Sequence, residues 1–137
     1  MTTPGRPPTA TVRPRRQLLT GALWCLQVLL AAVFISVAVA KLSGAPSSVQ
    51  TFDSIGLGQW LRYLTGAVEL AGGVGLLVPR LATLAGLGMA CVMVGASVAN
   101  LLVLAPAMTL VTILLGVASV VVAVGRWPTG PGSSASR

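Results

Sequence analysis

The sequence contains no histidine, and this absence limits the chemistry that the protein can perform. The ordinary ligand sets of haem and non-haem iron rely on histidine, and so does the Ser-His-Asp triad. The two cysteines, Cys25 and Cys91, lie far apart, so there is no Cys-x-x-Cys redox motif and no cysteine zinc site. We interpret both as small buried apolar side chains. We therefore predict no catalytic residue and no metal site.

Charged residues are also scarce, at 8% of the 137 residues, and only two of them are acidic. A soluble domain has about 25% charged residues, so this chain has too little polar surface to cover a soluble globule. Its hydrophobic residues, 55% of the total, come in long runs that indicate a lipid bilayer as solvent. The formal net charge is +7, but the basic residues stand at the edges of apolar runs, so nucleic-acid binding is not expected.

Four apolar runs predict an all-α fold, a four-helix transmembrane bundle. The first, Leu18 to Ala40, has 23 residues without a charge and would form a helix of about 35 Å, enough to cross a hydrocarbon core of about 30 Å. Proline ends helices at the two short breaks, Pro79-Arg80 and Ala105-Pro106. The spans are expected at about residues 18–40, 62–78, 81–104 and 107–125. They form a membrane domain, 17–126, between two tails predicted to be disordered, 1–16 and 127–137.

The distribution of basic residues predicts that both termini are cytoplasmic. Seven arginines fall on the side of the termini, whereas only two basic residues, Lys41 and Arg62, fall on the other side. By the positive-inside rule, the side with more basic residues is cytoplasmic, so Lys41 and Arg62 would be outside. The cytoplasmic arginines would also attract anionic lipid headgroups. An alternative is a cleaved twin-arginine signal at Arg15-Arg16, with a small-x-small site at residues 38–40. The apolar run is longer than the 7 to 15 residues typical of a signal peptide.

The connection between the first two spans, residues 42–61, contains a predicted short amphipathic helix. Ser47 or Ser48 is expected to cap its start. Val49, Phe52 and Ile55 would then fall on one side of it. This helix would lie on the outer bilayer surface or fold back over the bundle as a lid.

Glu69 stands inside the second apolar run, seven residues after Arg62 and so about 10 Å below the outer surface. Ionisable residues at such a depth usually face the bundle interior and have a partner. Gly66, Gly72 and Gly73 lie on the same face of the expected helix and leave room for a neighbouring helix. Arg62 is two turns away and too far for direct contact. Lys41, at the outer end of the first span, is the best cationic candidate.

Two residues of the third span extend this predicted cluster. Counted from the outer end, Asn100 falls near the depth of Glu69, and Ser97 lies one turn deeper on the same face. We therefore expect one polar cluster in the outer half of the bundle, made of Lys41, Glu69, Ser97 and Asn100. Three interpretations stay open. In the first, the cluster is a structural pin, in which Glu69 is either ionised or protonated and donating a hydrogen bond to Asn100. In the second, it binds a small polar or quinone-like molecule from the outer leaflet. In the third, it takes part in the translocation of a proton or a substrate.

Several short motifs together resemble the DoxX-like family of small bacterial membrane proteins. They are the run Lys41-Leu42-Ser43-Gly44, the stretch 56–61 (GLGQWL) and the longer stretch 66–80, which includes GAVELAGG and LLVPR. The resemblance covers about residues 25 to 125 and implies a four-helix membrane fold in the bacterial plasma membrane. Lys41 and Glu69 match polar positions of the family. Asn100 stands where many relatives have histidine, which argues against proton or metal chemistry there, and Ala38 stands where glycine is common.

The resemblance also implies a redox setting. The family name comes from an association with a quinol oxidase and thiosulfate–quinone chemistry, and some relatives are linked to membrane complexes that handle oxidative stress. We therefore expect a non-catalytic scaffold or accessory subunit with a membrane or periplasmic redox partner and with quinone or lipid as the candidate ligand near Glu69. The alternatives are a small-molecule transporter and a quinone-linked oxidoreductase subunit. The sequence does not indicate an oligomeric state.

Overall fold

The computed structural model describes residues 13–104 and 106–127, and within these residues the chain is all-helical. It has five helices there, listed in chain order: α1 Arg13–Leu42, α2 Pro46–Ile55, α3 Gln59–Leu77, α4 Ala82–Leu102 and α5 Pro106–Gly125. Helices α1, α3, α4 and α5 match the four predicted apolar runs to within a few residues. The predicted tails 1–16 and 127–137 lie mostly outside the described residues.

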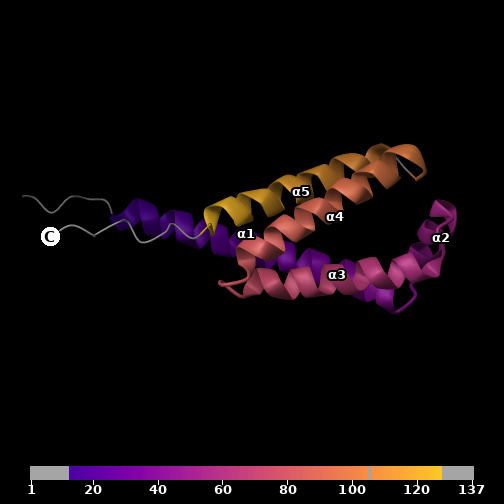
Figure 1. The fold of residues 1–137 in the computed structure, drawn as a ribbon. Coiled ribbons are helices and arrows are strands. Elements are labelled where there is room, and N and C mark those ends of the chain that lie inside the picture. The colour runs from indigo at the N-terminus through magenta and orange to yellow at the C-terminus, as the bar shows by residue number, and fades with distance from the viewer. Residues whose placement is uncertain (1–12, 105, 128–137) are drawn as a thin grey trace, which may run out of the picture.

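The four long helices form two antiparallel pairs (Figure 1). Helix α1 packs mainly on α3, and α4 packs mainly on α5, while α3 and α4 join the two pairs. The pairs lie together at the end where α1 begins and α5 ends, and they diverge toward the end where α2 crosses (Figure 1). The buried residues of α4 accordingly stop at Met93, and those of α5 begin at Ser119. The apolar core therefore occupies the half of the bundle away from α2.

Helix α1 begins earlier than the sequence predicts. Residues 13–16, which the prediction assigns to the disordered tail, form the first turn of this helix. Pro14 is tolerated there because the amide groups of a first turn have no partner within the helix, and arginine has a high helix propensity. The basic residues Arg15 and Arg16 therefore stand on a helix.

Helix α2 confirms the predicted amphipathic segment but not its predicted cap. Pro46 occupies the first turn after Ala45, and no side chain caps the helix, so the assignment of Ser47 or Ser48 as the cap is wrong. Proline starts the helix because its fixed φ is already helical. Gly56 ends it in a left-handed conformation, with φ of 76°. Phe52 is buried, so α2 folds back over the bundle.

Three of the helices in the described part of the chain are long and apolar enough, by length and composition, to cross a membrane. They are Arg15–Leu42, Ala82–Leu102 and Pro106–Gly125. Most of their large apolar side chains are exposed, as lipid-facing side chains would be. Helix α3 is not among the three, and it carries the buried Arg62 and Glu69.

Glycine permits close contacts between the helices. A methyl group at Gly86 of α4 would lie 2.7 Å from the carbonyl oxygen of Ser119 on α5, and one at Gly75 of α3 would lie 3.0 Å from the side chain of Ala85 on α4. In a bilayer, lipid tails are as apolar as the side chains, so close packing is a main source of helix association. These glycines therefore determine which helices meet and in what register.

Candidate functional site

The candidate site is centred on an ion pair between α1 and α3. Lys41 Nζ, in the last turn of α1, lies 2.6 Å from Glu69 Oε1, in the middle of α3. The Glu69 side chain is 2% exposed and that of Lys41 is 17% exposed. The structure thus brings together the two charged residues of the predicted cluster.

Two glycines explain how the pair forms. A methyl group at Gly66 would lie 3.2 Å from Lys41 Cβ, and one at Gly73 would lie 2.8 Å from the side chain of Ile35. These glycines stand one turn before and one turn after Glu69, so the two helix backbones approach closely on both sides of the carboxylate. The long side chain of Lys41 then reaches along α3 to the carboxylate.

Within the described residues, only one of the two carboxylate oxygens of Glu69 has a hydrogen-bond partner. Its Oε2 is buried and has no hydrogen-bond partner within the residues that the structure describes. An ionised carboxylate can accept about four hydrogen bonds, and a buried one needs most of them to offset its loss of hydration. Oε2 is therefore the atom of this site that is free to accept a further hydrogen bond.

Arg62 is joined to the pair through the backbone of α1. Its Nη1 donates to the carbonyl oxygen of Lys41, and its Nε donates to Gln59 Oε1 at 2.6 Å. Sequence reasoning considered Arg62 only as a direct partner of Glu69 and missed this role. The available signal was the end of α1, where the last carbonyl groups have no partner within the helix and attract a cation.

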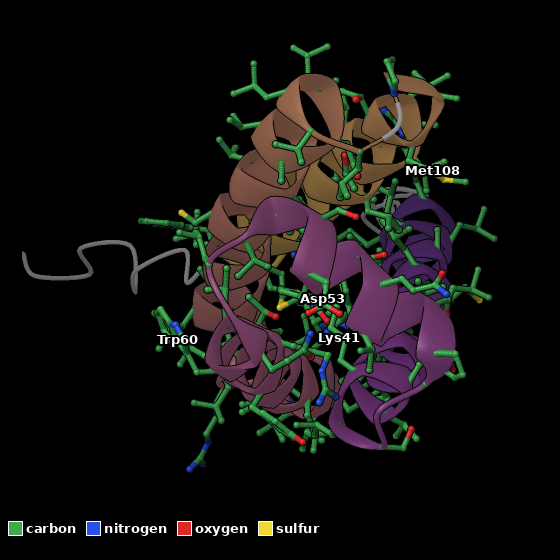
Figure 2. All side chains as sticks on the ribbon, turned by 90° about the vertical axis from the view of Figure 1, so that its right-hand side faces the viewer. Lys41, Asp53, Trp60 and Met108 are labelled. Atoms are coloured by element: carbon green, nitrogen blue, oxygen red, sulfur yellow. The ribbon has the colours of Figure 1, made fainter. Side chains whose placement is uncertain are left out.

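Gln59 continues the network to α2. Its Nε2 donates to the carbonyl oxygen of Val49 at 3.2 Å and to Asp53 Oδ1 at 2.6 Å. The buried ring of Phe52 places its centre 5.7 Å from Lys41 Nζ, within range of a cation–π interaction. Figure 2 looks onto this end of the bundle and shows Lys41 and Asp53 near its middle, whereas Trp60 points outward at the edge.

The network balances its own charges. It holds Lys41 and Arg62 on the positive side and Glu69 and Asp53 on the negative side, which are all the acidic residues of the chain. Three helices, α1, α2 and α3, each contribute to it. The arrangement closes one end of the bundle with a neutral set of polar contacts, which suits a region of low dielectric constant.

Ser97 and Asn100 are not brought to Glu69. Ser97 Oγ lies 2.7 Å from Thr112 Oγ1 of α5, and Asn100 is half-buried near the C-terminal end of α4. The contact between Gly75 and Ala85 sets the register of α3 against α4, and it places Glu69 level with residue 91. Asn100 is then nine residues, or about 13 Å, further toward the C-terminal end of α4. Counting depth from the helix ends did not capture this register.

A second polar cluster, which sequence reasoning missed, lies at the opposite end of the bundle. Gln27 of α1 is 0% exposed; its Nε2 donates to the carbonyl oxygen of Leu76 at 2.7 Å, and its Oε1 accepts from Arg126 Nε at 2.8 Å. Thr83 donates to the carbonyl oxygen of Arg126 at 2.9 Å. The feature of the sequence that could have indicated this cluster is Gln27 itself, a lone amide inside an uncharged apolar run.

These contacts share one physical purpose. The carbonyl groups at the end of a helix have no partner within it, and lipid offers none. Side chains of neighbouring helices supply donors to such groups: Gln27 does so at the end of α3 and Thr83 just after the end of α5. At the end of α1, the carbonyl oxygen of Lys41 accepts both from Arg62 and from the backbone N–H of Gly44. These polar side chains thus satisfy part of the backbone hydrogen bonding at the helix ends.

The structure also differs from the prediction for the two cysteines. Cys25 and Cys91 are free and exposed, so the prediction that both are buried is wrong. Each stands on a helix that is apolar on all sides, and such a run does not reveal which side faces a neighbouring helix. In a membrane, both thiols would face lipid.

Of three comparisons with known proteins, one gave a match. A search of curated proteins and a search of solved structures each found no match. A scan against family models matched residues 25–122 to the DoxX-like family. The matched region includes four of the five helices almost completely, together with the whole Lys41–Glu69 network. With its long apolar helices, the chain is a membrane protein that belongs to the DoxX-like family.

Proposed function

We propose that this protein is a non-catalytic subunit of a membrane complex, in which the Lys41–Glu69 network holds α1, α2 and α3 as a rigid scaffold. The proposal rests on the contacts of the charged side chains: each charged side chain in the network is bonded to another part of the same chain. Groups that are committed to one another in this way stabilise a fold. The link to redox or oxidative-stress chemistry rests on the family resemblance.

The proposal includes a four-span topology in the bacterial plasma membrane with both termini in the cytoplasm. Helix α3 has 19 residues and a length of about 28 Å, close to the hydrocarbon thickness. Its two buried charged residues, Arg62 and Glu69, face its neighbours, so its outer surface can remain in contact with lipid. Cysteine labelling from either side of the membrane, at positions 2 and 136, tests the location of the termini.

A specific observation favours a second function, the binding of a small molecule with a hydroxyl donor, such as a quinol. Glu69 Oε2 is buried and has a free acceptor site. The neighbouring cavity, lined by Lys41, Phe52 and three hydroxyl side chains of α2, has a volume of about 130 Å³. Ligand pockets usually measure about 300–1,000 Å³, so α2 would have to move outward to admit a quinol.

Gentle extraction with native lipids, followed by mass spectrometry, tests the scaffold. We expect a partner protein in fixed stoichiometry, retained when Lys41→Met and Glu69→Leu are combined, because that double variant replaces the ion pair by an apolar contact. A quinone that co-purifies with the wild type and is lost in Glu69→Gln would support the second function instead. A flux into proteoliposomes that Glu69→Gln abolishes would contradict the scaffold and support a transporter.

A further inference from the structure

We propose that the groove between α1 and α5, at the end of the bundle where α1 begins and α5 ends, binds one anionic phospholipid, with the phosphate on Arg16 and an acyl chain between the helices. The groove has a volume of about 1000 Å³. Its walls are formed by Arg16 and Thr20 together with apolar residues of both helices, listed here: Leu19, Ala22, Leu23, Leu26, Val120, Val121, Val124 and Gly125.

The length of the groove suits a lipid. It extends along α1 from Arg16 to Leu26, which is ten residues or about 15 Å. Because the groove begins in the headgroup layer, this length covers the headgroups and only the first part of the roughly 15 Å of hydrocarbon that one leaflet supplies. Leu26 also lines a second apolar groove, which continues along the same pair of helices past Leu30 and Val33. An acyl chain therefore finds an unbroken apolar path from the surface to the middle of the bilayer.

The depth of Arg16 suits contact with a lipid headgroup. A methyl group at Gly125 would meet the side chain of Leu23, so these two residues lie at the same level. Trp127, exposed just after the end of α5, marks the membrane interface in the way that aromatic residues usually do. Arg16 is seven residues, or about 10 Å, beyond the level of Gly125. Its guanidinium group thus falls in the headgroup layer, at the height of lipid phosphates.

The charge of Arg16 favours an anionic ligand. Arg15, Arg16 and Arg80 are exposed. Both acidic side chains of the chain belong to the network at the other end, and Lys41 is 25 residues, or about 37 Å, along α1 from Arg16. At an ionic strength near 0.15 M, charges this far apart are screened from one another. No acidic side chain of this sequence is therefore near enough to pair with Arg16, and a phosphate suits the planar guanidinium group.

Arg16 differs from the other arginines in its position above the groove. The side chain of Arg126 is already bonded to Gln27 and stacks on Trp24, with its Cζ 4.9 Å from the ring centre. Arg80 is exposed in the turn between α3 and α4 and does not line the groove. Arg16 alone, among the described arginines, combines a headgroup position with an apolar channel for the chain.

Native mass spectrometry of the purified full-length protein tests the proposal. The protein is equilibrated with equal amounts of dioleoyl phosphatidylglycerol and dioleoyl phosphatidylcholine, and the bound lipid is counted. We expect the wild type to retain one molecule of phosphatidylglycerol in preference to phosphatidylcholine. In Arg16→Gln this preference should fall about fivefold, since one arginine near the surface contributes roughly this factor. Arg80→Gln, which removes the same charge outside the groove, should leave the preference unchanged.

A second variant tests the path of the acyl chain. Ala22→Trp fills the groove from an exposed position and leaves the charge unaltered, so we expect retention of the lipid to fall at least fivefold. Millimolar glycerol 1-phosphate, which carries the headgroup anion without a chain, should not displace the lipid. The proposal is overturned if Arg16→Gln and Arg80→Gln reduce the preference equally, if Ala22→Trp has no effect, or if glycerol 1-phosphate competes. Helical circular dichroism of each variant verifies that it has folded.

Discussion

The ion pair between Lys41 and Glu69 makes an asymmetric prediction about stability. Lys41→Met leaves the carboxylate, which is 2% exposed, without a partner on either oxygen. Breaking a buried pair in this way costs about 3–5 kcal/mol of unfolding free energy. Glu69→Gln keeps the shape of the side chain, and the partly exposed amine of Lys41 can turn toward the nearby end of the bundle, so we expect a cost of about 1–2 kcal/mol.

The double variant Lys41→Met/Glu69→Leu decides whether the pair itself is needed for stability. Replacing both members of a buried pair by apolar residues of similar volume is often neutral or stabilising, so we expect its stability to lie within about 1 kcal/mol of the wild type. Reversible unfolding in mild detergent titrated with sodium dodecyl sulfate would measure all three variants. The reasoning is refuted if Lys41→Met is no less stable than Glu69→Gln, or if the double variant is less stable than both single variants.

Three further predictions concern the packing and the helix ends. Gly86→Ala should lose about 1–3 kcal/mol, because its new methyl group meets the Ser119 carbonyl, whereas Gly88→Ala has open space and should be neutral in the same titration. Gln27→Leu removes the donor to the last turn of α3 and should lose about 1–3 kcal/mol, while Ser36→Ala, which removes an exposed hydroxyl, should not. Gln59→Leu should speed amide hydrogen exchange in α2 severalfold, and Gln50→Leu, at an exposed position, should leave it unchanged; equal rates in the two variants would show that Gln59 does not hold α2.

The sequence predicted the elements of this fold well because the bilayer imposes a strong one-dimensional constraint. A long run of apolar residues must form a helix in lipid, where every backbone polar group needs an internal partner. The same reasoning applies to Glu69: a carboxylate in such a run turns inward, and the glycines on its face showed which side that would be. Lys41 followed as the nearest cation able to reach it.

The start of α1 and the cap of α2 show where local rules were weaker. Pro14 and Pro46 both occupy first turns, in which proline is tolerated, so each helix begins at an earlier residue than its polar composition suggested. The hydroxyl groups of Ser47 and Ser48 are not needed as caps once Pro46 starts the helix. Such choices differ by small free energies, and tertiary contacts decide between them.

Lateral packing was decided by the tertiary structure alone. Hydropathy describes which residues enter the membrane but not which faces meet, since in lipid every face of these helices can be apolar. The close approach of Gly75 to Ala85 sets the register that leaves Asn100 about 13 Å from the level of Glu69, and it could not be read from segment lengths. The capping roles of Gln27 and Arg62, and the exposure of Cys25, likewise follow from which helix lies beside which. The sequence by itself therefore determined the helices and the inward carboxylate, because burial in lipid is a property of each segment, whereas the partners of each side chain depended on contacts between segments.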